Sequence, residues 1–340
     1  MSTRALGVDV YRGVCAVSKC RRRMVGAEEG MREGESVREW ELRRLRAIHG
    51  VDQRAPWAVF AHPALKVPAG EVRVAQAGAD SREFVAGTSS VVWGAAFALC
   101  RFLCDATGLA QAEAGAGAEA EGEAEAEAEA QRGAARSTMS EEARAYSETC
   151  ASARRGVVTR DTVAVELGAG LGLVVLCVAA LGARRVAVTD AEVGLLRQNV
   201  DGSGLAGRAE CVALTWVAGA HVPPGDASVN ALLQRLPCRP HLIVASDVIY
   251  MQGKDDMVKL VDTVSALASE ETAVLIAFEE RGDWGCLGDF WDAAADAGLE
   301  GDHVDLTEDL QGVGGVGDAD RILLRLRKKS KAKDTPGSEG

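Results

Sequence analysis

From residue 162 onward, short apolar runs alternate with longer stretches in which apolar residues recur at helical spacing. A short run rich in β-branched residues is typical of a buried strand, and a spacing of three to four is typical of a helix. This alternation predicts a mostly parallel sheet with helices on both faces. We expect strands at Val163–Leu167, Arg185–Thr189, Ala209–Leu214, Leu242–Ser246, Thr272–Phe278 and Ile322–Arg327, and helices at Leu171–Leu181, Val193–Ser203, Lys254–Ala268 and Leu287–Ala297.

A further strand near Gly301–Leu306 would form a hairpin with Ile322–Arg327 and add an antiparallel pair at the sheet edge. The predicted fold class is therefore α/β, a Rossmann-like, doubly wound, seven-stranded sheet with an antiparallel edge strand. Before this unit, the pattern predicts a hairpin of two short strands, Trp57–Ala61 and Glu71–Ala75. It also predicts a buried helix at Thr88–Asp105 and a polar helix at Ser140–Arg155.

The remaining segments lack the periodicity of packed elements. We expect residues 1–55 to be poorly ordered, apart from a short helix over Val37–Ile48. Residues 110–135 are a low-complexity Ala/Glu/Gly tract without an apolar face, which predicts a solvated insertion; a partner-binding segment is the alternative. Residues 328–340 predict a disordered basic tail, with a nuclear localisation signal as the alternative. One domain, residues 56–327, contains the rest.

The acidity of the chain is concentrated in that tract. The net charge is −12, and Gln111–Gln131 holds seven Glu and no basic residue. This distribution does not indicate a nucleic-acid-binding surface. The hydrophobic content of 47% is sufficient for a packed core.

The nine cysteines include no Cys-x-x-Cys pair, and the five histidines are dispersed. This pattern predicts reduced thiols in a cytosolic or nuclear protein and no metal site. No apolar run reaches the length of a membrane span, and the N-terminus lacks the apolar core of a secretory signal. Its Arg content leaves an organelle transit peptide open.

Candidate chemistry begins where the first parallel strand ends in a glycine-rich turn. Glu166 lies two residues before Gly168, and Gly170 and Gly172 follow at every second position. At such a strand–turn–helix junction, backbone N–H groups can approach a ligand closely. Asp190 closes the next strand, where an acid is placed to accept hydrogen bonds from a ribose. Together these residues indicate a nucleoside-containing cofactor, and a purely structural turn is the alternative.

Two features distinguish this turn from a dinucleotide-binding fingerprint. Leu173 occupies the position of the third glycine of that fingerprint. The carboxylate of Glu166 would repel a pyrophosphate, whereas it suits a cofactor that carries an ammonium or a sulfonium. We therefore expect S-adenosyl-L-methionine as the cofactor, and a nicotinamide dehydrogenase is the less favoured alternative.

A second group of candidate residues follows the strand Leu242–Ser246, which leads into Asp247 and Tyr250. In an open parallel sheet, ligands bind outside the carboxyl ends of the strands at the switch point. The first and fourth strands are neighbours there in doubly wound order, so we expect Asp247 and Tyr250 beside the Gly168 turn. On local sequence alone, a helix cap by Asp247 and core packing of Tyr250 are equally supported.

In combination these motifs resemble the seven-strand S-adenosylmethionine-dependent methyltransferases of methyltransferase family 16, a group of lysine methyltransferases. The resemblance covers roughly Gly87–Arg327, interrupted by the Ala/Glu tract, and makes residues 56–327 a methyltransferase domain. The motifs that carry it are Val165–Gly172, Asp190, Leu195–Val200, Leu214–Trp216 and Ala245–Tyr250, together with Val91–Ala96, which resembles the family's Val-Trp-x-Ala-Ala element.

The resemblance implies roles for individual residues. Trp93 would line the methionine end of the cofactor, Trp216 would flank the adenine, and Ser246 would contact the cofactor through its backbone. Asp247 and Tyr250 would shape the lysine channel and act as the catalytic residues. The complete set of implied cofactor-binding residues is Trp93, Glu166, Gly168, Ala169, Gly170, Gly172, Asp190, Trp216 and Ser246.

The activity implied by the resemblance is methylation of a lysine side-chain amine in a protein substrate. The alternatives are methylation of another nitrogen, in His, Arg or a small molecule, and a non-catalytic scaffold that binds proteins through the acidic insertion. The expected partner is a protein that presents a lysine, with no membrane and no nucleic acid, and we expect a monomer.

Overall fold

The structure is a computed structural model that describes residues 55–77, 91–116, 140–216, 228–250, 253–280, 284–306 and 320–329. The predicted helix over Val37–Ile48 lies outside the described residues. Most of the Ala/Glu tract and of the basic tail lies outside them as well.

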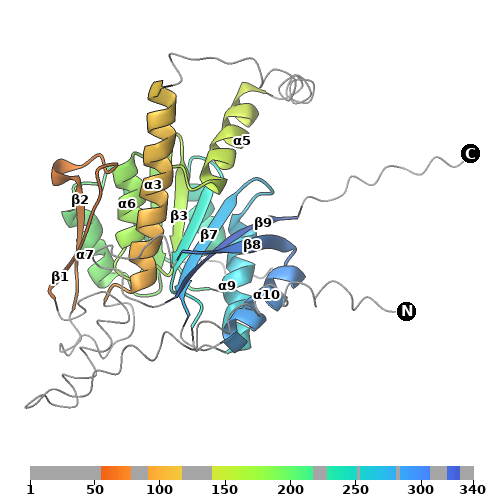
Figure 1. Cartoon of the computed structure of the whole chain (residues 1–340). Helices are drawn as coiled ribbons and strands as arrows, with labels where there is room; N and C mark the ends of the chain where they lie inside the picture. Colours follow the sequence, from red (N-terminus) through yellow and green to blue (C-terminus); the bar gives the residue numbers. More distant parts are fainter. Residues whose placement is uncertain are drawn as a thin grey trace, which may run out of the picture.

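Seven strands form the sheet at the centre of the fold (Figure 1). They are β3 (Val163–Leu167), β4 (Arg185–Asp190), β5 (Ala209–Ala213), β6 (Leu242–Ser246), β7 (Ala273–Glu279), β8 (Leu299–Asp305) and β9 (Arg321–Lys328). Their spatial order is β5-β4-β3-β6-β7-β9-β8. Strands β3 to β7 are parallel, and β9 is antiparallel to both of its neighbours.

The predicted fold class is confirmed, and each predicted strand of the sheet is present. The pairing of β3 with β6 confirms that the first and fourth strands are neighbours at the switch point. The antiparallel strand β9 lies one position in from the edge, and its hairpin partner β8 forms the edge itself. Both ends of β9 extend one residue beyond the prediction, because the flanking Arg321 and Lys328 also pair in the sheet.

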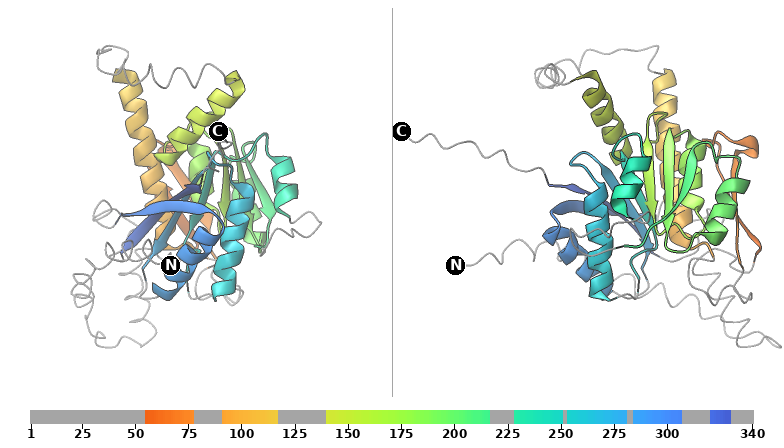
Figure 2. Two further views of the ribbon diagram at one scale, coloured as in Figure 1. Left: turned by 90° about the vertical axis from the view of Figure 1, so that its right-hand side faces the viewer. Right: turned by 180° about the vertical axis from the view of Figure 1, so that it is seen from behind.

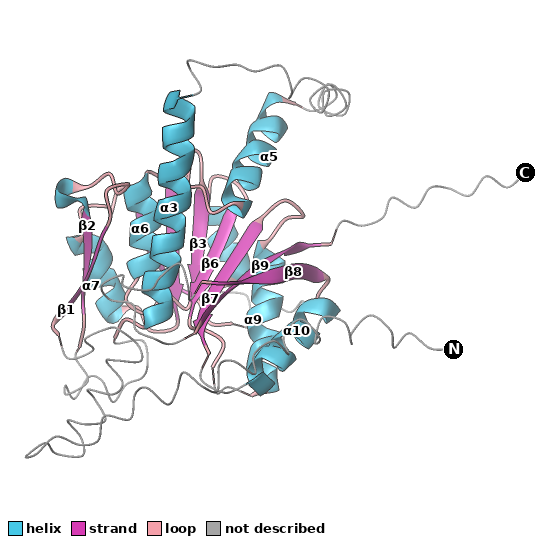
Figure 3. Cartoon of the chain, viewed as in Figure 1, coloured by secondary structure: helices cyan, strands magenta, loops and turns pink. Residues whose placement is uncertain are grey.

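Helices cover both faces of the sheet (Figure 2 and Figure 3). One face carries α3 (Gly94–Ala116), α5 (Glu141–Arg154), α6 (Leu173–Leu181) and α7 (Gly194–Gly202). The other face carries α8 (Val229–Arg235), α9 (Lys254–Leu267) and α10 (Trp284–Asp296). Helix α6 is buried at all of its positions, because it packs between the sheet and α3. This explains why its sequence is apolar all round.

The predicted hairpin consists of β1 (Trp57–Ala61) and β2 (Glu71–Ala75), with the short 3-10 helix η3 (Pro68–Gly70) between them. Asn199 on α7 connects β2 to the glycine turn. Its Oδ1 accepts the N–H of Ala75 at 2.7 Å, and its Nδ2 donates to the carbonyl of Leu171 at 3.1 Å. The hairpin therefore supports the turn that follows β3.

Three helices differ from the prediction. Helix α10 begins at Trp284 instead of Leu287, and helix α3 begins at Gly94 instead of Thr88, with the described residues 91–93 outside the helix. Helix α3 continues past Asp105 to Ala116, into the first residues of the Ala/Glu tract. Ala has the highest helix propensity, so a helix already anchored by its buried part extends readily into an Ala-rich segment. Helix α8 was not predicted, because it has only 7 residues and buries only Val229 and Leu232.

Candidate active site

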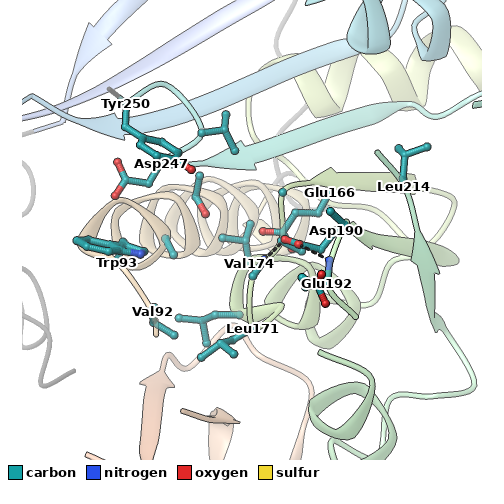
Figure 4. A pocket seen from close by; sticks show the side chains of 18 of the residues that line it. Val92, Trp93, Glu166, Leu171, Val174, Asp190, Glu192, Leu214, Asp247 and Tyr250 are labelled. Atoms are coloured by element: carbon teal, nitrogen blue, oxygen red, sulfur yellow. Dashed lines mark hydrogen bonds between the residues drawn. The ribbon is translucent and has the colours of Figure 1, made fainter. Parts of the chain in front are cut away.

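A cavity of about 580 Å³ lies at the carboxyl ends of β3, β4 and β6. The start of α3, the segment after β5 and the first two turns of α9 complete its wall. Its volume lies within the range of about 300–1,000 Å³ that is typical of small-ligand sites. In Figure 4, Trp93, Asp247 and Tyr250 lie toward one end of the pocket, and Glu166, Asp190 and Glu192 lie toward the other.

All the predicted site residues except Gly172 line this cavity. They are Trp93, Glu166, Gly168, Ala169, Gly170, Asp190, Trp216, Ser246, Asp247 and Tyr250. Gly172 instead forms the N-cap of α6 with a φ of 83°, in the left-handed region. A Cβ there would lie 2.7 Å from Leu196 Cδ1, so this glycine serves the packing of the turn.

The turn after β3 requires a glycine at its first position. Gly168 has a φ of +62°, and a Cβ on it would lie 2.8 Å from Val248 Cγ1 and 3.1 Å from Trp216 Cζ2. Real Cβ atoms almost never come as close as the first distance. The absent side chain therefore lets Trp216 and the segment that carries Asp247 pack against the turn.

The carboxylate of Asp190 holds the same turn from β4. Its Oδ2 accepts the N–H of Gly170 at 2.8 Å, and its Oδ1 accepts the N–H of Glu192 at 3.0 Å. Burial raises the pKa of Asp190 above its usual value, and these backbone hydrogen bonds oppose the shift. Each carboxylate oxygen has a further lone pair, so Asp190 can also accept hydrogen bonds from a ligand.

Glu166 is a fully buried carboxyl group beside the cavity. Its Oε2 accepts the N–H of Val175 in the first turn of α6 at 3.0 Å. Its Oε1 has no hydrogen-bond partner among the described residues. Burial raises the pKa of Glu166 to about 8, and the charge of Asp190 adds to this effect. A buried carboxyl oxygen without a donor fits a ligand that brings an N–H group.

Asp247 follows β6 in a backbone conformation that is uncommon for residues other than glycine. Its φ is 58°, in a left-handed region that Asp adopts more readily than most residues. Its N–H donates to the carbonyl of Ala277 at 2.7 Å, and its Oδ1 accepts the N–H of Glu279 at 3.3 Å. The alternative that Asp247 caps the next helix is wrong, because the N-cap of α9 is Gly253.

Sequence reasoning missed several residues of the cavity wall, among them Glu192, Asp256 and Lys259. Asp256 and Lys259 belong to the first two turns of α9, and Lys259 Nζ donates to Asp256 Oδ1 at 2.8 Å. The sequence predicts this helix but gives no signal that its first turns reach the cavity. Within the described ranges, no three His, Cys, Asp or Glu side chains gather in a way that could hold a metal ion.

A family model described as lysine methyltransferase matches residues 80–285, which is more than half of the chain. The chain belongs to the lysine methyltransferase family. The cofactor of this family is S-adenosyl-L-methionine, and the resemblance stated from the motifs is confirmed. No helix in the described part of this methyltransferase is long and apolar enough to cross a membrane.

Solved structures that resemble this methyltransferase include a TehB-like S-adenosylmethionine-dependent methyltransferase from Corynebacterium glutamicum. The two are 18% identical, with 60% of this chain and 97% of that chain covered and a TM-score of 0.38. The N-methyltransferase NodS from Bradyrhizobium japonicum, in complex with S-adenosyl-L-homocysteine, is 15% identical to this chain. The match covers 50% of this chain and 79% of that chain, with a TM-score of 0.35.

The mitomycin 7-O-methyltransferase MmcR is 17% identical, with a TM-score of 0.34. The match covers 50% of this chain and 49% of that chain, so this chain spans about half the length of MmcR. No curated protein matches the chain.

The residues around the cavity fit the cofactor of the family. The methionine part carries an ammonium, which can donate to the buried Oε1 of Glu166. The ribose carries two hydroxyls, which can donate to Asp190. Among the described residues that line the cavity, Lys259 is the one basic side chain, so they form no cationic cluster of the kind that binds phosphates.

Proposed function

We propose that the protein transfers a methyl group from S-adenosyl-L-methionine to a lysine side-chain amine of a protein substrate. One observation carries this proposal. Asp247, a buried carboxylate in a left-handed conformation, lines the same cavity as the glycine turn and Glu166. Uncommon backbone conformations concentrate at functional sites, where the surrounding structure maintains them.

We assign the cofactor-binding roles to the residues that line the cavity. Glu166 and the backbone of Gly168–Gly170 hold the methionine and ribose portions, and Asp190 accepts hydrogen bonds from the ribose hydroxyls. Trp216 flanks the adenine, while Trp93 and the backbone of Ser246 line the methionine end. This assignment is supported by the parallel pairing of β3 and β4, which brings their carboxyl ends together, and by the hydrogen bond between Asp190 and Gly170.

The bound cofactor supplies a methyl group that is already activated on a sulfonium. The task of the protein is therefore to orient the acceptor amine and to let it lose a proton, because an ammonium has no lone pair. Apolar side chains of the cavity wall, such as Val92, Leu173 and Val248, disfavour the charged form of a bound lysine. Asp247 accepts a hydrogen bond from the amine and orients it, and Tyr250 offers its ring face and its hydroxyl.

The charges of the cavity favour a cationic substrate group over an anionic one. Carboxyl groups dominate the ionisable side chains of the wall in the described part of the chain, where Lys259 is the one basic residue and is paired with Asp256. A lysine side chain that approaches this cavity meets an attractive field, whereas a phosphate does not. The expectations of a protein substrate, no nucleic-acid partner, a monomer and a cytosolic or nuclear location stay predictions.

Labelled S-adenosylmethionine and a cell extract provide the test. The purified protein is incubated with both, and the labelled bands are digested and analysed by mass spectrometry. We expect methyl groups on lysine in one or a few proteins. Asp247→Asn serves as the matched negative control, because it preserves the shape of the side chain and removes its charge.

Label on His, Arg or a small molecule would replace the lysine assignment with methylation of another nitrogen. Binding of the cofactor without any transfer would favour the non-catalytic scaffold.

A further inference from the structure

We infer that Glu279 and Arg321 form a buried ion pair that positions Asp247 for the reaction. Neither residue lines the cavity. The backbone N–H of Glu279 contacts Asp247, and Arg321 lies opposite Glu279, one strand further from Asp247. The inference rests on the proposed function of Asp247, and it assigns positioning roles to two residues of β7 and β9.

The ion pair is formed by the last residue of β7 and the first residue of β9. Glu279 and Arg321 are direct partners in the antiparallel register. Arg321 Nη2 donates to Glu279 Oε1 at 2.8 Å, and the exposed fractions of the two side chains are 1% and 0%. A fully buried Arg–Glu pair is uncommon, because both charges must leave water.

Two hydrogen bonds transmit the position of this pair to Asp247. The backbone N–H of Glu279 donates to Asp247 Oδ1 at 3.3 Å. The N–H of Asp247 donates to the carbonyl of Ala277, two residues earlier on β7, at 2.7 Å. The end of β7 therefore fixes both the backbone and one carboxylate oxygen of Asp247.

Stability alone does not account for a buried ion pair at this place. Well-packed apolar residues of similar volume often stabilise a fold as well as a buried ion pair does. The backbone of Glu279 is already paired with Arg321, and the N–H of Glu280 donates to the carbonyl of Asp320 at 2.9 Å. The side-chain ion pair adds a second, buried contact between β7 and β9 at the point where the N–H of Glu279 contacts Asp247. The geometry therefore favours a role in placing the carboxylate of Asp247.

The chain offers a matched control on the same strand. Arg325 on β9 donates to Asp302 on β8 at 2.8 and 2.7 Å, but this pair is exposed, and neither residue is among those that line the cavity. The test compares the double variant Glu279→Met/Arg321→Met with Asp302→Met/Arg325→Met. Each double variant replaces both members of one Arg–carboxylate pair between β9 and a neighbouring strand.

Three measurements are made on the full-length proteins. Isothermal titration with S-adenosyl-L-homocysteine measures the affinity for the cofactor product. Incorporation of label into the band of the cell extract, at increasing amounts of extract, measures the rate of methyl transfer. Hydrogen–deuterium exchange measures the exchange rates of the backbone amides of Asp247–Tyr250 and of Glu279.

For Glu279→Met/Arg321→Met we expect unchanged cofactor affinity and faster exchange at Asp247–Tyr250. The saturated transfer rate should fall at least about tenfold, because misplacement of a reacting group has large effects, while the half-saturating amount of extract stays the same. The Asp302/Arg325 double variant should match the wild type in all three measurements. Arg321→Lys, which keeps the charge, should recover part of the transfer rate.

Unchanged exchange at Asp247–Tyr250, or a wild-type transfer rate in the Glu279/Arg321 double variant, would overturn the inference. A wild-type protein that transfers no methyl group would instead contradict the proposed function. The exchange measurement still decides in that case whether the ion pair holds Asp247 in place, because it does not depend on transfer.

Discussion

The carboxylate of Asp190 accepts the backbone N–H of Gly170 at 2.8 Å and so joins the end of β4 to the glycine turn after β3. The two motifs lie 20 residues apart in the sequence. Parallel pairing of β3 and β4 brings them together, with Leu167 opposite Thr189. The turn and the proposed ribose site therefore form one unit, and a change in Asp190 affects both.

The first prediction is that Asp190→Ala weakens cofactor binding strongly. The substitution removes the proposed hydrogen bonds to the ribose hydroxyls, each worth about 1.5–3 kcal/mol for a charged acceptor. Isothermal titration with S-adenosyl-L-homocysteine measures the change, and the exposed Asp201 on α7 provides the control variant Asp201→Ala. Equal affinities for Asp190→Ala and the wild type would rule out the ribose assignment.

The second prediction concerns the pH dependence contributed by Glu166. Its pKa is raised to about 8 in the folded protein, from an ordinary value of 4.5. The folded state therefore holds a proton that the unfolded state has already released between these pH values. The contribution of Glu166 to stability is complete below pH 4.5 and is lost as the pH rises through 8.

Glu166→Gln mimics the protonated form and should remove this dependence. We expect the variant to be more stable than the wild type at pH 8, by a few kcal/mol, and to be similar at pH 4.5. Urea unfolding of both proteins at the two pH values measures the difference. A stability difference that is the same at both pH values would show that Glu166 titrates normally.

The third prediction concerns His241, at the opposite end of the sheet. Its Nδ1 accepts the N–H of Val163 at 3.0 Å, and burial lowers its pKa to about 4. The unfolded chain binds a proton near pH 6.5, before the folded protein does, so stability falls as the pH decreases from 6.5 to 4. This contribution is about 1–2 kcal/mol at pH 5.

His241→Gln removes the titrating ring and keeps a side-chain acceptor. Its free energy of unfolding should therefore fall less than that of the wild type between pH 7 and pH 5. Parallel pH dependences for the two proteins would contradict the assigned pKa.

The sequence predicted the glycine turn, the neighbouring strands β3 and β6 and the location of Asp247 at the switch point. These features depend on local pattern and on chain topology, which one sequence contains. The ion pair of Glu279 and Arg321 was not predicted. Each residue lies one position beyond a predicted strand, because a charged residue at the end of an apolar run indicates that the strand has ended.

The contribution of α9 to the cavity could not be predicted from the sequence either. The predicted helix, Lys254–Ala268, closely matches the observed one, Lys254–Leu267. The placement of Asp256 and Lys259 at the cavity depends on the path of the chain after Tyr250, which periodicity does not specify. The left-handed conformation of Asp247 likewise follows from its contacts with β7, which are distant in the sequence.

Asp247→Asn tests most directly whether Asp247 orients the acceptor amine. Asn accepts the N–H of Glu279 as Asp does and also tolerates the left-handed conformation, so the variant should fold and bind cofactor like the wild type. Asp296→Ala, at an exposed position of α10, provides the control. We predict that the rate of methyl transfer to the labelled band falls about a hundredfold in Asp247→Asn. A folded, cofactor-binding Asp247→Asn protein that transfers methyl groups at the wild-type rate would contradict the account.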